Sequence, residues 1–393
     1  MSDILKDIRV LEVAEGIAGP TCGLQLADLG AEVIKIEPPA GDRAREWGPP
    51  MVGDDAAIFA HLNRGKMSLC LELRESAGRD AFSSLLAITD VAIVHMEPED
   101  RVDIGLDWDA LVERYPRLIV CLLADLGENG PWANQPGSEL VCQALSGMTR
   151  YLSQPDGPPL RLGFEIAAQA VAMHAIQAVL AALLWRRRSG SGQVIKLSHL
   201  GSLLSMKTIQ LAAQSSAFDE WKGFHLNGPQ WPPDIGWEAS DGQISFDFRN
   251  NRKEGWKAFC NEIGLGHLVL DSDYDANFNL TADMGDRRDD LGLVYRAPLS
   301  KLSSAAASEI INRNNGTSMK FNDLGEALAH PQVQTLDPLI AVPSAPLGAR
   351  MQLGTPFKRI GTPPRTDYRP APRLGEHTQV ILRYVGDAGE TKE

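Results

Sequence analysis

The stretch IRVLEVAEGIAGPTCGLQLADLGAEVIKIE, residues 8–37, decides the fold of the first half of the chain. Residues 8–14 predict a buried strand, residues 16–20 a turn, residues 21–29 a helix and residues 31–37 a second strand. A strand, a helix and a strand in about thirty residues form a βαβ unit, in which the two strands are parallel. This stretch therefore predicts an α/β domain.

The same alternation continues beyond this stretch. Short apolar runs predict further strands, and amphipathic or apolar patterns predict helices between them. The expected strands are 68–73, 90–94 and 118–123, and the expected helices are 108–114, 138–148 and 166–188. The last helix ends in Arg186, Arg187 and Arg188, which we interpret as surface charges that suit the helix C-terminus.

The composition changes after residue 218. The chain becomes richer in tryptophan, proline and glycine, and a polar tract at 271–290 predicts a connector with little core of its own. We expect three parts: a large Rossmann-like domain at 1–219, a small α+β domain at 220–330, and a C-terminal segment, 331–393, that returns to the large domain. The expected elements of the second half are a strand at 244–248 and helices at 256–263, 299–311, 322–328 and 377–384.

Charge and composition exclude several classes of function. A net charge of −13 argues against general affinity for nucleic acid or anionic membranes, because those partners require a basic surface. No apolar run is expected to reach the length of a membrane span, about 18 residues, and the first residues lack the apolar core of a signal peptide. The five cysteines show no CxxC spacing, so neither disulfides nor a metal site are expected. We expect a cytoplasmic protein with no tightly bound cofactor.

Two local motifs are relevant to ligand binding. The turn GIAGP at 16–20 departs from GxGxxG, which argues against a nicotinamide site. Arg64 and Lys66, just before a predicted strand, are either phosphate-binding groups or, more commonly for such residues, part of a solvated turn.

Several segments together resemble the family III CoA-transferases, which include formyl-CoA transferase, carnitine CoA-transferase and α-methylacyl-CoA racemase. The segments are residues 8–39, HLNRGKMSLCLEL, DVAIV, GLDWDALVERYPRLIVCLLADLGENGPW, LVCQALSG, AVLAALLWRRRSGSGQVIKLS and LGEHTQVI, in the family's order over nearly the whole chain. The resemblance implies a large Rossmann-like domain, a smaller second domain, and two ring-shaped subunits interlocked like chain links. It also implies an acyl-CoA and a small carboxylic acid as substrates.

The resemblance places the family's catalytic aspartate at Ala168. Family transferases use this aspartate to attack the acyl-CoA thioester, which an alanine methyl group cannot do. The racemases pair the aspartate with a histidine, whose position here is Ser138. Both groups are therefore expected to be absent.

The expected CoA pocket also departs from the family pattern. Pro38 stands where formyl-CoA transferase has an arginine, and Asp103 stands where a second arginine is expected. Asp103 would repel a CoA phosphate, and Arg101 is the nearest possible substitute.

Other residues are candidates for the missing chemistry. Glu165 is the runner-up nucleophile, although a capping or surface role is the more common one for a glutamate at a helix start. We interpret His174 as a core or interface histidine, and Asp125 as a substrate-contacting or solvated carboxylate. The candidates for contact with CoA or substrate are Ile17, Ala18, Arg64, Lys66, His95, Met96, Arg101, Ser138 and Glu139.

The preferred interpretation is the nucleophile-lacking subunit of a heteromeric family III CoA-transferase. It resembles the aspartate-lacking subunit of benzylsuccinate-type enzymes, which move CoA from succinyl-CoA to an aryl-substituted succinate. The expected partner is a homologous subunit that retains the aspartate. Trp221, Trp231 and Trp237 either line an aromatic acceptor pocket or pack in the core. The alternatives are an acyl-CoA isomerase or lyase with a different acid and base, and a homodimeric pseudoenzyme with a binding role.

Overall fold

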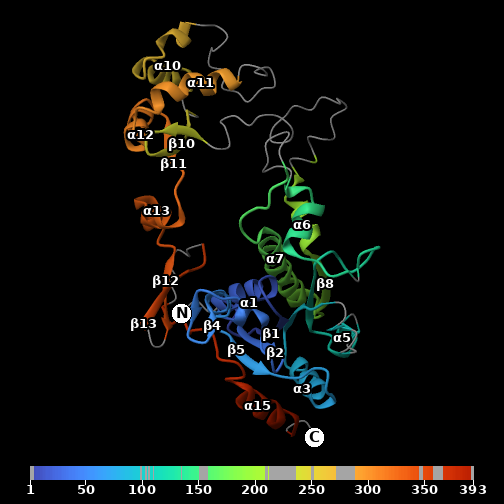
Figure 1. Cartoon of the computed structure of the whole chain (residues 1–393). Helices are drawn as coiled ribbons and strands as arrows, with labels where there is room; N and C mark the ends of the chain where they lie inside the picture. The colour runs from blue at the N-terminus through green and yellow to red at the C-terminus, as the bar shows by residue number, and fades with distance from the viewer. Residues whose placement is uncertain are drawn as a thin grey trace. The chain divides into compact units, whose positions relative to one another are not determined.

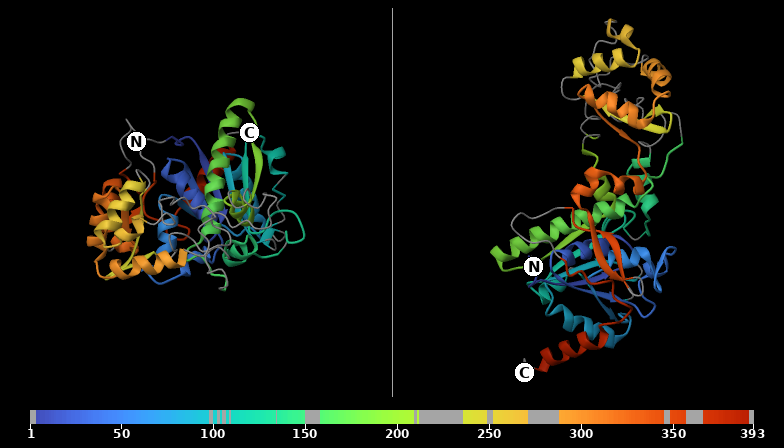
Figure 2. Two further views of the ribbon diagram at one scale, coloured as in Figure 1. Left: turned by 90° about the horizontal axis from the view of Figure 1, so that it is seen from above. Right: turned by 90° about the vertical axis from the view of Figure 1, so that its left-hand side faces the viewer.

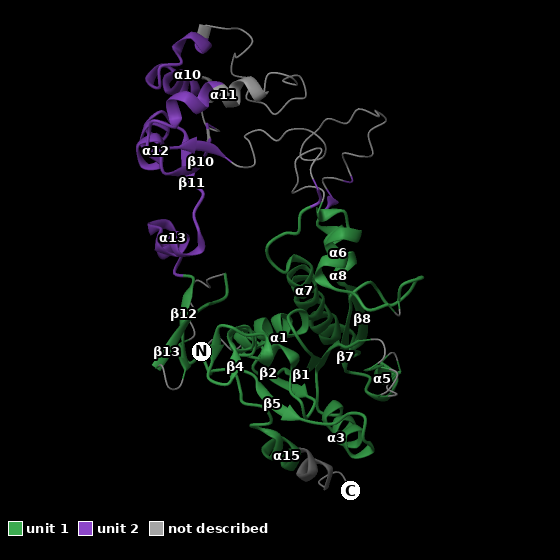
Figure 3. Cartoon of the chain, viewed as in Figure 1, with its two compact units in different colours: residues 1–152, 160–206, 338–393 green, residues 153–159, 207–337 purple. Residues whose placement is uncertain are grey.

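The computed structural model divides the chain into two compact units (Figures 1 and 3). Unit 1 comprises residues 1–152, 160–206 and 338–393, and unit 2 comprises 153–159 and 207–337. The structure describes residues 4–97, 100–101, 104, 107–108, 110–133, 135–149, 158–208, 211, 236–248, 252–270, 288–344, 348–356 and 366–390.

Unit 1 is built on a six-stranded parallel sheet. Its strand order is β5 (Met67–Cys70), β2 (Glu32–Glu37), β1 (Arg9–Ala14), β6 (Val91–His95), β7 (Ile119–Ala124) and β8 (Gln193–Ser198). The α/β prediction is confirmed, and its strands at 8–14, 31–37, 68–73, 90–94 and 118–123 match β1, β2, β5, β6 and β7 to within a few residues. β8 was predicted only as a short apolar run, because its exposed lysine and glutamine interrupt the buried pattern.

The two faces of the sheet bury two separate cores. Ile119, Cys121 and Leu123 of β7 belong to one core, whereas Val120 and Leu122 belong to the other. This alternation follows from the two-residue period of a strand. Helices α1 (Ala18–Asp28) and α7 (Ile166–Ser189) cover the first face, and α3 (Ser76–Leu86) and α15 (Thr378–Glu390) pack on the second.

The remaining elements of unit 1 are short or lie near the ends of the strands. They are η1 (Arg43–Glu46), β3 (Met51–Val52), β4 (Asp55–Ala56), α2 (Ala57–Leu62), α5 (Leu111–Arg114), α6 (Glu139–Leu145), α8 (His199–Ser205) and the hairpin of β12 (Leu339–Ser344) and β13 (Gly348–Leu353).

Unit 2 contains a three-stranded antiparallel sheet with helices and its own core. The sheet has the order β11 (Thr317–Lys320), β10 (Gly242–Asp247) and β9 (Trp237–Ala239). Trp237 is buried and packs against Phe246 and Tyr295, which confirms that it is a core residue. The other two tryptophans, Trp221 and Trp231, lie outside the described residues, as does most of the predicted connector at 271–290. The other elements are α10 (Arg252–Glu262), η3 (Gly266–Leu270), α11 (Arg288–Leu299), α12 (Ser304–Arg313), α13 (Leu324–Ala329) and α14 (Pro331–Leu336).

Helix α7 is the longest element, and two expectations about it need correction. This helix, drawn in green in Figure 2, is long and apolar enough to cross a membrane, contrary to the expectation from sequence. However, 56% of its most apolar 18-residue window is buried. Burial against α1 and the sheet is typical of the core helix of a soluble protein. Arg186 is not a surface charge: it is buried and its Nη2 lies 2.7 Å from Asp90 Oδ1.

The contact between α1 and β1 requires a glycine at position 19. A Cβ atom at Gly19 would lie 2.2 Å from Ala14 Cβ, and both atoms are fixed by backbone. Helix propensity alone predicts that Gly19→Ala stabilises the chain by about 1 kcal/mol. We expect the clash to reverse this sign and lower the free energy of unfolding by about 1–3 kcal/mol in urea titrations.

Gly163→Ala is the matched control for this prediction. Among the described residues, no neighbouring atom lies within 4 Å of a Cβ built on Gly163. We expect its free energy of unfolding to stay within about 0.5 kcal/mol of wild type. Equal effects of the two substitutions would show that the α1–β1 contact tolerates a methyl group.

Candidate functional site

A cavity of about 190 Å³ opens at the carboxyl ends of β1, β2, β5 and β6. Strand order reverses between β1 and β6, and ligands of open α/β sheets bind outside the carboxyl ends of the strands at this point. Pro38, His95 and Met96 line the cavity, so three of the positions singled out in the sequence meet here.

Carboxylates outnumber cations around this cavity. Its charged lining residues are Arg43, Arg74, Glu15, Glu72, Glu97 and Asp100. Arg43 lies 3.7 Å from Glu97, and Arg74 pairs with Asp100. Burial and the neighbouring Asp42 raise the pKa of Glu15. The cavity therefore offers two arginines, each already paired with a carboxylate, to an anionic ligand.

Arg101 lies beside a second, smaller cavity, together with His95, Met96, Asp125 and Gln135. Its guanidinium pairs with Glu128 and donates to the carbonyl oxygens of Met96 and Leu123. These bonds direct it toward the ends of β6 and β7. Asp103 lies outside the described residues.

Arg64 and Lys66 are not residues of a solvated turn, which corrects the commoner interpretation of this motif. Both are buried. Arg64 pairs with Asp28 and donates to Gln352 Oε1, and Lys66 Nζ donates to Glu12, the Pro20 carbonyl oxygen and Asn63. Because an ammonium has three donors, all those of Lys66 are used inside unit 1.

Helix α7 begins where the catalytic aspartate is expected. Ala168 lies in its first turn and is 7% exposed. Its amide donates to Glu139 Oε2 over 3.0 Å, and the amide of Ala167 donates to Glu139 Oε1 over 2.8 Å. Gln143 Nε2 also donates to Glu139 Oε1, at 2.8 Å. Glu139, from the start of α6, is thus the carboxylate that occupies the N-terminus of α7.

Glu165 has a surface role and does not cap the helix. It is the N-cap residue by position, but its side chain makes no capping hydrogen bond and pairs with Arg161 at 2.6 Å. The capping function expected of Glu165 belongs to Glu139, which is 26 residues earlier in the chain.

The other candidates lie at helix starts or helix contacts. Ile17 is the N-cap of α1, and Ala18 is its first, buried residue. Ser138 is the N-cap of α6 and accepts a hydrogen bond from the Val141 amide. His174 Nε2 lies 3.3 Å from Ser205 Oγ of α8, consistent with a histidine at a contact between helices.

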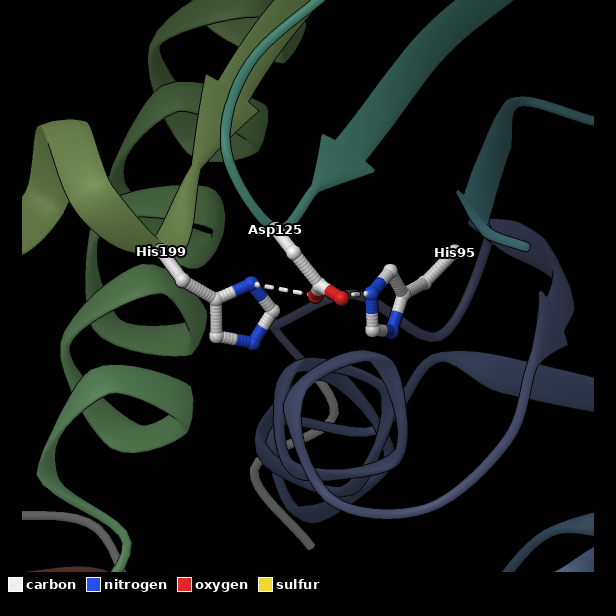
Figure 4. Close-up of side chains that lie close together, drawn as sticks. All are labelled: His95, Asp125 and His199. Carbon is white, nitrogen blue, oxygen red and sulfur yellow. Dashed lines mark hydrogen bonds and ion pairs between the residues drawn. The ribbon is translucent and has the colours of Figure 1, made fainter. Parts of the chain in front are cut away.

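His95, Asp125 and His199 converge at the ends of β6, β7 and β8 (Figure 4). Asp125 Oδ1 lies 3.1 Å from His95 Nε2 and 3.2 Å from His199 Nδ1. Burial alone would raise the pKa of Asp125, but the hydrogen bond from His95 and the charges of both histidines lower it to about 2. Burial and the neighbouring His95 lower the pKa of His199.

His199 was not predicted from the sequence, and neither was its proximity to His95 and Asp125. A signal was present, since each of the three residues ends or directly follows a strand. Carboxyl ends of neighbouring parallel strands meet at one edge of the sheet. The signal could be used only after 193–198 was recognised as a strand.

The sequence matches the profile described as CoA-transferase family III over residues 5–378. It is 30% identical to the succinate–glutarate CoA-transferase of Agrobacterium fabrum, with 96% of this chain and 94% of that protein covered. It is 26% identical to the succinyl-CoA–L-malate CoA-transferase β subunit of Chloroflexus aurantiacus, with 97% and 94% covered. Its structure is similar to that of a CaiB/BaiF family protein from Brucella suis, with a TM-score of 0.82, 27% identity and 96% and 98% coverage.

Proposed function

Because this chain belongs to CoA-transferase family III, we propose that it is the nucleophile-lacking subunit of a two-component enzyme. The complex moves CoA from succinyl-CoA to a carboxylic acid, in the cytoplasm. The names of the Agrobacterium fabrum and Chloroflexus aurantiacus relatives support a dicarboxylate acceptor, and that of the latter supports assembly from subunits. An aryl-substituted succinate is the acceptor that we favour, on the resemblance to benzylsuccinate-type enzymes.

The start of α7 is the observation that carries this proposal. Ala168 supplies no carboxylate, and Glu165 is held by Arg161. Glu139 accepts three hydrogen bonds, two of them from helix-terminal amides, which stabilise its negative charge and make it a weaker nucleophile. The family's attack on the thioester therefore requires an aspartate from another subunit.

The cavity beside β1 and β6 supports assigning the CoA site to the partner. CoA carries several negatively charged phosphate groups. The walls of this cavity contain four carboxylates and only two arginines. Like charges at short range oppose binding of such a ligand. Pro38, in the wall of the same cavity, has no hydrogen-bond donor to offer a phosphate group.

Exposed apolar side chains on three packed helices support a stable partner. They are Leu140, Val141 and Leu145 of α6, Met173, Leu184 and Trp185 of α7, and Leu204 of α8. These helices contact one another within unit 1. Exposed large apolar side chains on neighbouring helices are typical of protein–protein interaction sites. We propose an interlocked heterodimer or heterotetramer with the catalytic subunit.

Co-expression with a homologue that has aspartate at the position of Ala168 tests the proposal. We expect the pair to transfer CoA from succinyl-CoA to a dicarboxylic acid, and the lone chain to have no activity. Glu165→Ala in this chain leaves kcat within about twofold, whereas replacing the partner's aspartate by alanine lowers kcat by at least about a thousandfold.

The outcomes separate the alternatives. Transferase activity of the purified lone chain contradicts the proposal. Conversion of an acyl-CoA by the lone chain without an acceptor acid indicates an isomerase or lyase. A stable homodimer that binds no homologue and has no activity indicates a pseudoenzyme with a binding role.

A further inference from the structure

We propose that His95, Asp125 and His199 form a binding site for one divalent zinc ion. The ligand atoms are His95 Nε2, Asp125 Oδ1 and His199 Nδ1, which all lie within 4.8 Å of one another. Figure 4 shows both rings turned toward the same carboxylate. All three ligands belong to unit 1 of this chain. The site therefore needs no partner subunit, and its test does not depend on the proposed function.

The sheet explains why these three side chains meet. His95 is the last residue of β6, Asp125 directly follows β7, and His199 directly follows β8. These strands are parallel neighbours, with His95 paired to Leu123 and Ala124 paired to Ser198. The backbone thus brings the three positions to one edge before any metal binds, which reduces the ordering needed for binding.

The distances match those of ligands that share one ion. Zinc binds histidine nitrogen and carboxylate oxygen at about 2.0–2.2 Å, so two ligands of a tetrahedral ion lie about 3.3 Å apart. The two nitrogen–oxygen distances are 3.1 and 3.2 Å. The two histidine rings need to move closer together and to turn so that both nitrogens face the ion.

The chemical nature of the ligands selects the metal. Two imidazoles and one carboxylate suit zinc and other transition ions, whereas magnesium and calcium prefer oxygen ligands alone. Three protein ligands leave a fourth position open, as in catalytic zinc sites. His95 and Asp125 both line the smaller cavity, which has room for about one water molecule at this position.

Neighbouring groups hold the ligands in place. Asp125 Oδ2 accepts a hydrogen bond from the Gly137 amide over 3.2 Å. By contrast, the Ala124 carbonyl oxygen, 3.1 Å from His199 Nδ1, opposes coordination by this nitrogen: zinc binding requires the ring to turn away from the carbonyl and its proton to move to Nε2. The competing arrangement is a metal-free cluster in which both rings donate to Asp125.

Titration of the chelator-treated full chain distinguishes these arrangements. Zinc chloride is added in a calorimeter, and cobalt chloride is added while the visible spectrum is recorded. We expect about one equivalent of either metal per chain and the intense visible bands of four-coordinate cobalt. His199→Ala and Asp125→Asn lower zinc affinity at least about a hundredfold.

Asp125→Asn is the decisive variant because asparagine keeps the shape and the Oδ1 acceptor. In a metal-free cluster it leaves any weak zinc binding unchanged; the melting temperature falls in either arrangement, because an asparagine Nδ2 cannot accept the hydrogen bond from the Gly137 amide. The control His61→Ala lies in α2, where His61 bonds to the Ala57 carbonyl oxygen, and it leaves zinc binding unchanged. Absence of saturable zinc binding by the wild type, or equal affinity in wild type and Asp125→Asn, overturns the proposal.

Discussion

Replacing Glu12 by glutamine is expected to lower the free energy of unfolding by about 3–5 kcal/mol. Glu12 lies in β1 and is 0% exposed. Its Oε1 is 3.1 Å from Lys35 Nζ, and its Oε2 is 2.7 Å from Lys66 Nζ. Glutamine preserves the volume but leaves Lys66 without its carboxylate in a buried position, and an uncompensated buried charge is costly.

Urea denaturation measures this effect, with Glu46→Gln as the matched control. Glu46 is exposed in η1, so its replacement changes the free energy of unfolding by less than about 0.5 kcal/mol. The double variant Glu12→Gln/Lys66→Met should recover part of the loss, because it removes the uncompensated ammonium. A double variant as unstable as the sum of the two single variants would show that Glu12 and Lys66 do not interact.

Alkaline pH should destabilise the protein through two buried thiols, with a loss of about 3 kcal/mol between pH 7.5 and 10. Cys22 of α1 and Cys121 of β7 are both 0% exposed. Burial raises the pKa of Cys22 well above its ordinary value and raises the pKa of Cys121 to about 12. In the unfolded chain both thiols ionise near pH 9.

The sign follows from the protons that each state binds. Below pH 9 the thiols are protonated in both states and contribute nothing. Between pH 9 and 12 the folded state keeps protons that the unfolded state releases, so stability falls by about 1.4 kcal/mol per thiol for each pH unit. Lys66 changes stability in the opposite direction over this range, because burial lowers its pKa to about 8, so the thiol contribution is taken from the difference between wild type and a variant without these thiols.

Urea denaturation in reductant at pH 7.5 and pH 10 tests this prediction against Cys22→Ala/Cys121→Ala. The double variant is less stable at both pH values because it contains cavities. Its decrease between the two pH values should be about 3 kcal/mol smaller than that of wild type. Parallel decreases in the two proteins would show that these thiols do not couple folding to pH.

The sequence predicted those helices and strands whose own residues show a clear apolar pattern. The apolar runs of β1, β2, β6 and β7 and the long pattern of α7 carry their own periodicity, so their positions were found to within a few residues. β8 was missed as a strand because its residues are only partly buried and three of its six are polar or charged.

The site depends on contacts between residues far apart in the chain, which no local pattern encodes. Lys66 lies in the polar sequence NRGK, which is typical of a solvated turn. Its ammonium is nevertheless buried, where it is paired with Glu12, 54 residues away in the chain. Glu139 caps α7 from a preceding helix, and Glu165 at the expected cap position does not. The order of the strands in the sheet thus determines which charged side chains meet in the interior. This order can be predicted only once every strand has been identified.

The shared carboxylate of Glu12 also bears on the order of folding events. Lys35 belongs to β2, and Lys66 directly precedes β5, so one side chain of β1 joins the three strands on this side of the sheet. None of the three charges can enter the interior alone, because an unpaired buried ion is too costly. We therefore expect the segment from β1 to β5 to behave as a single cooperative folding unit, whose backbone amides share one opening free energy in native-state hydrogen exchange.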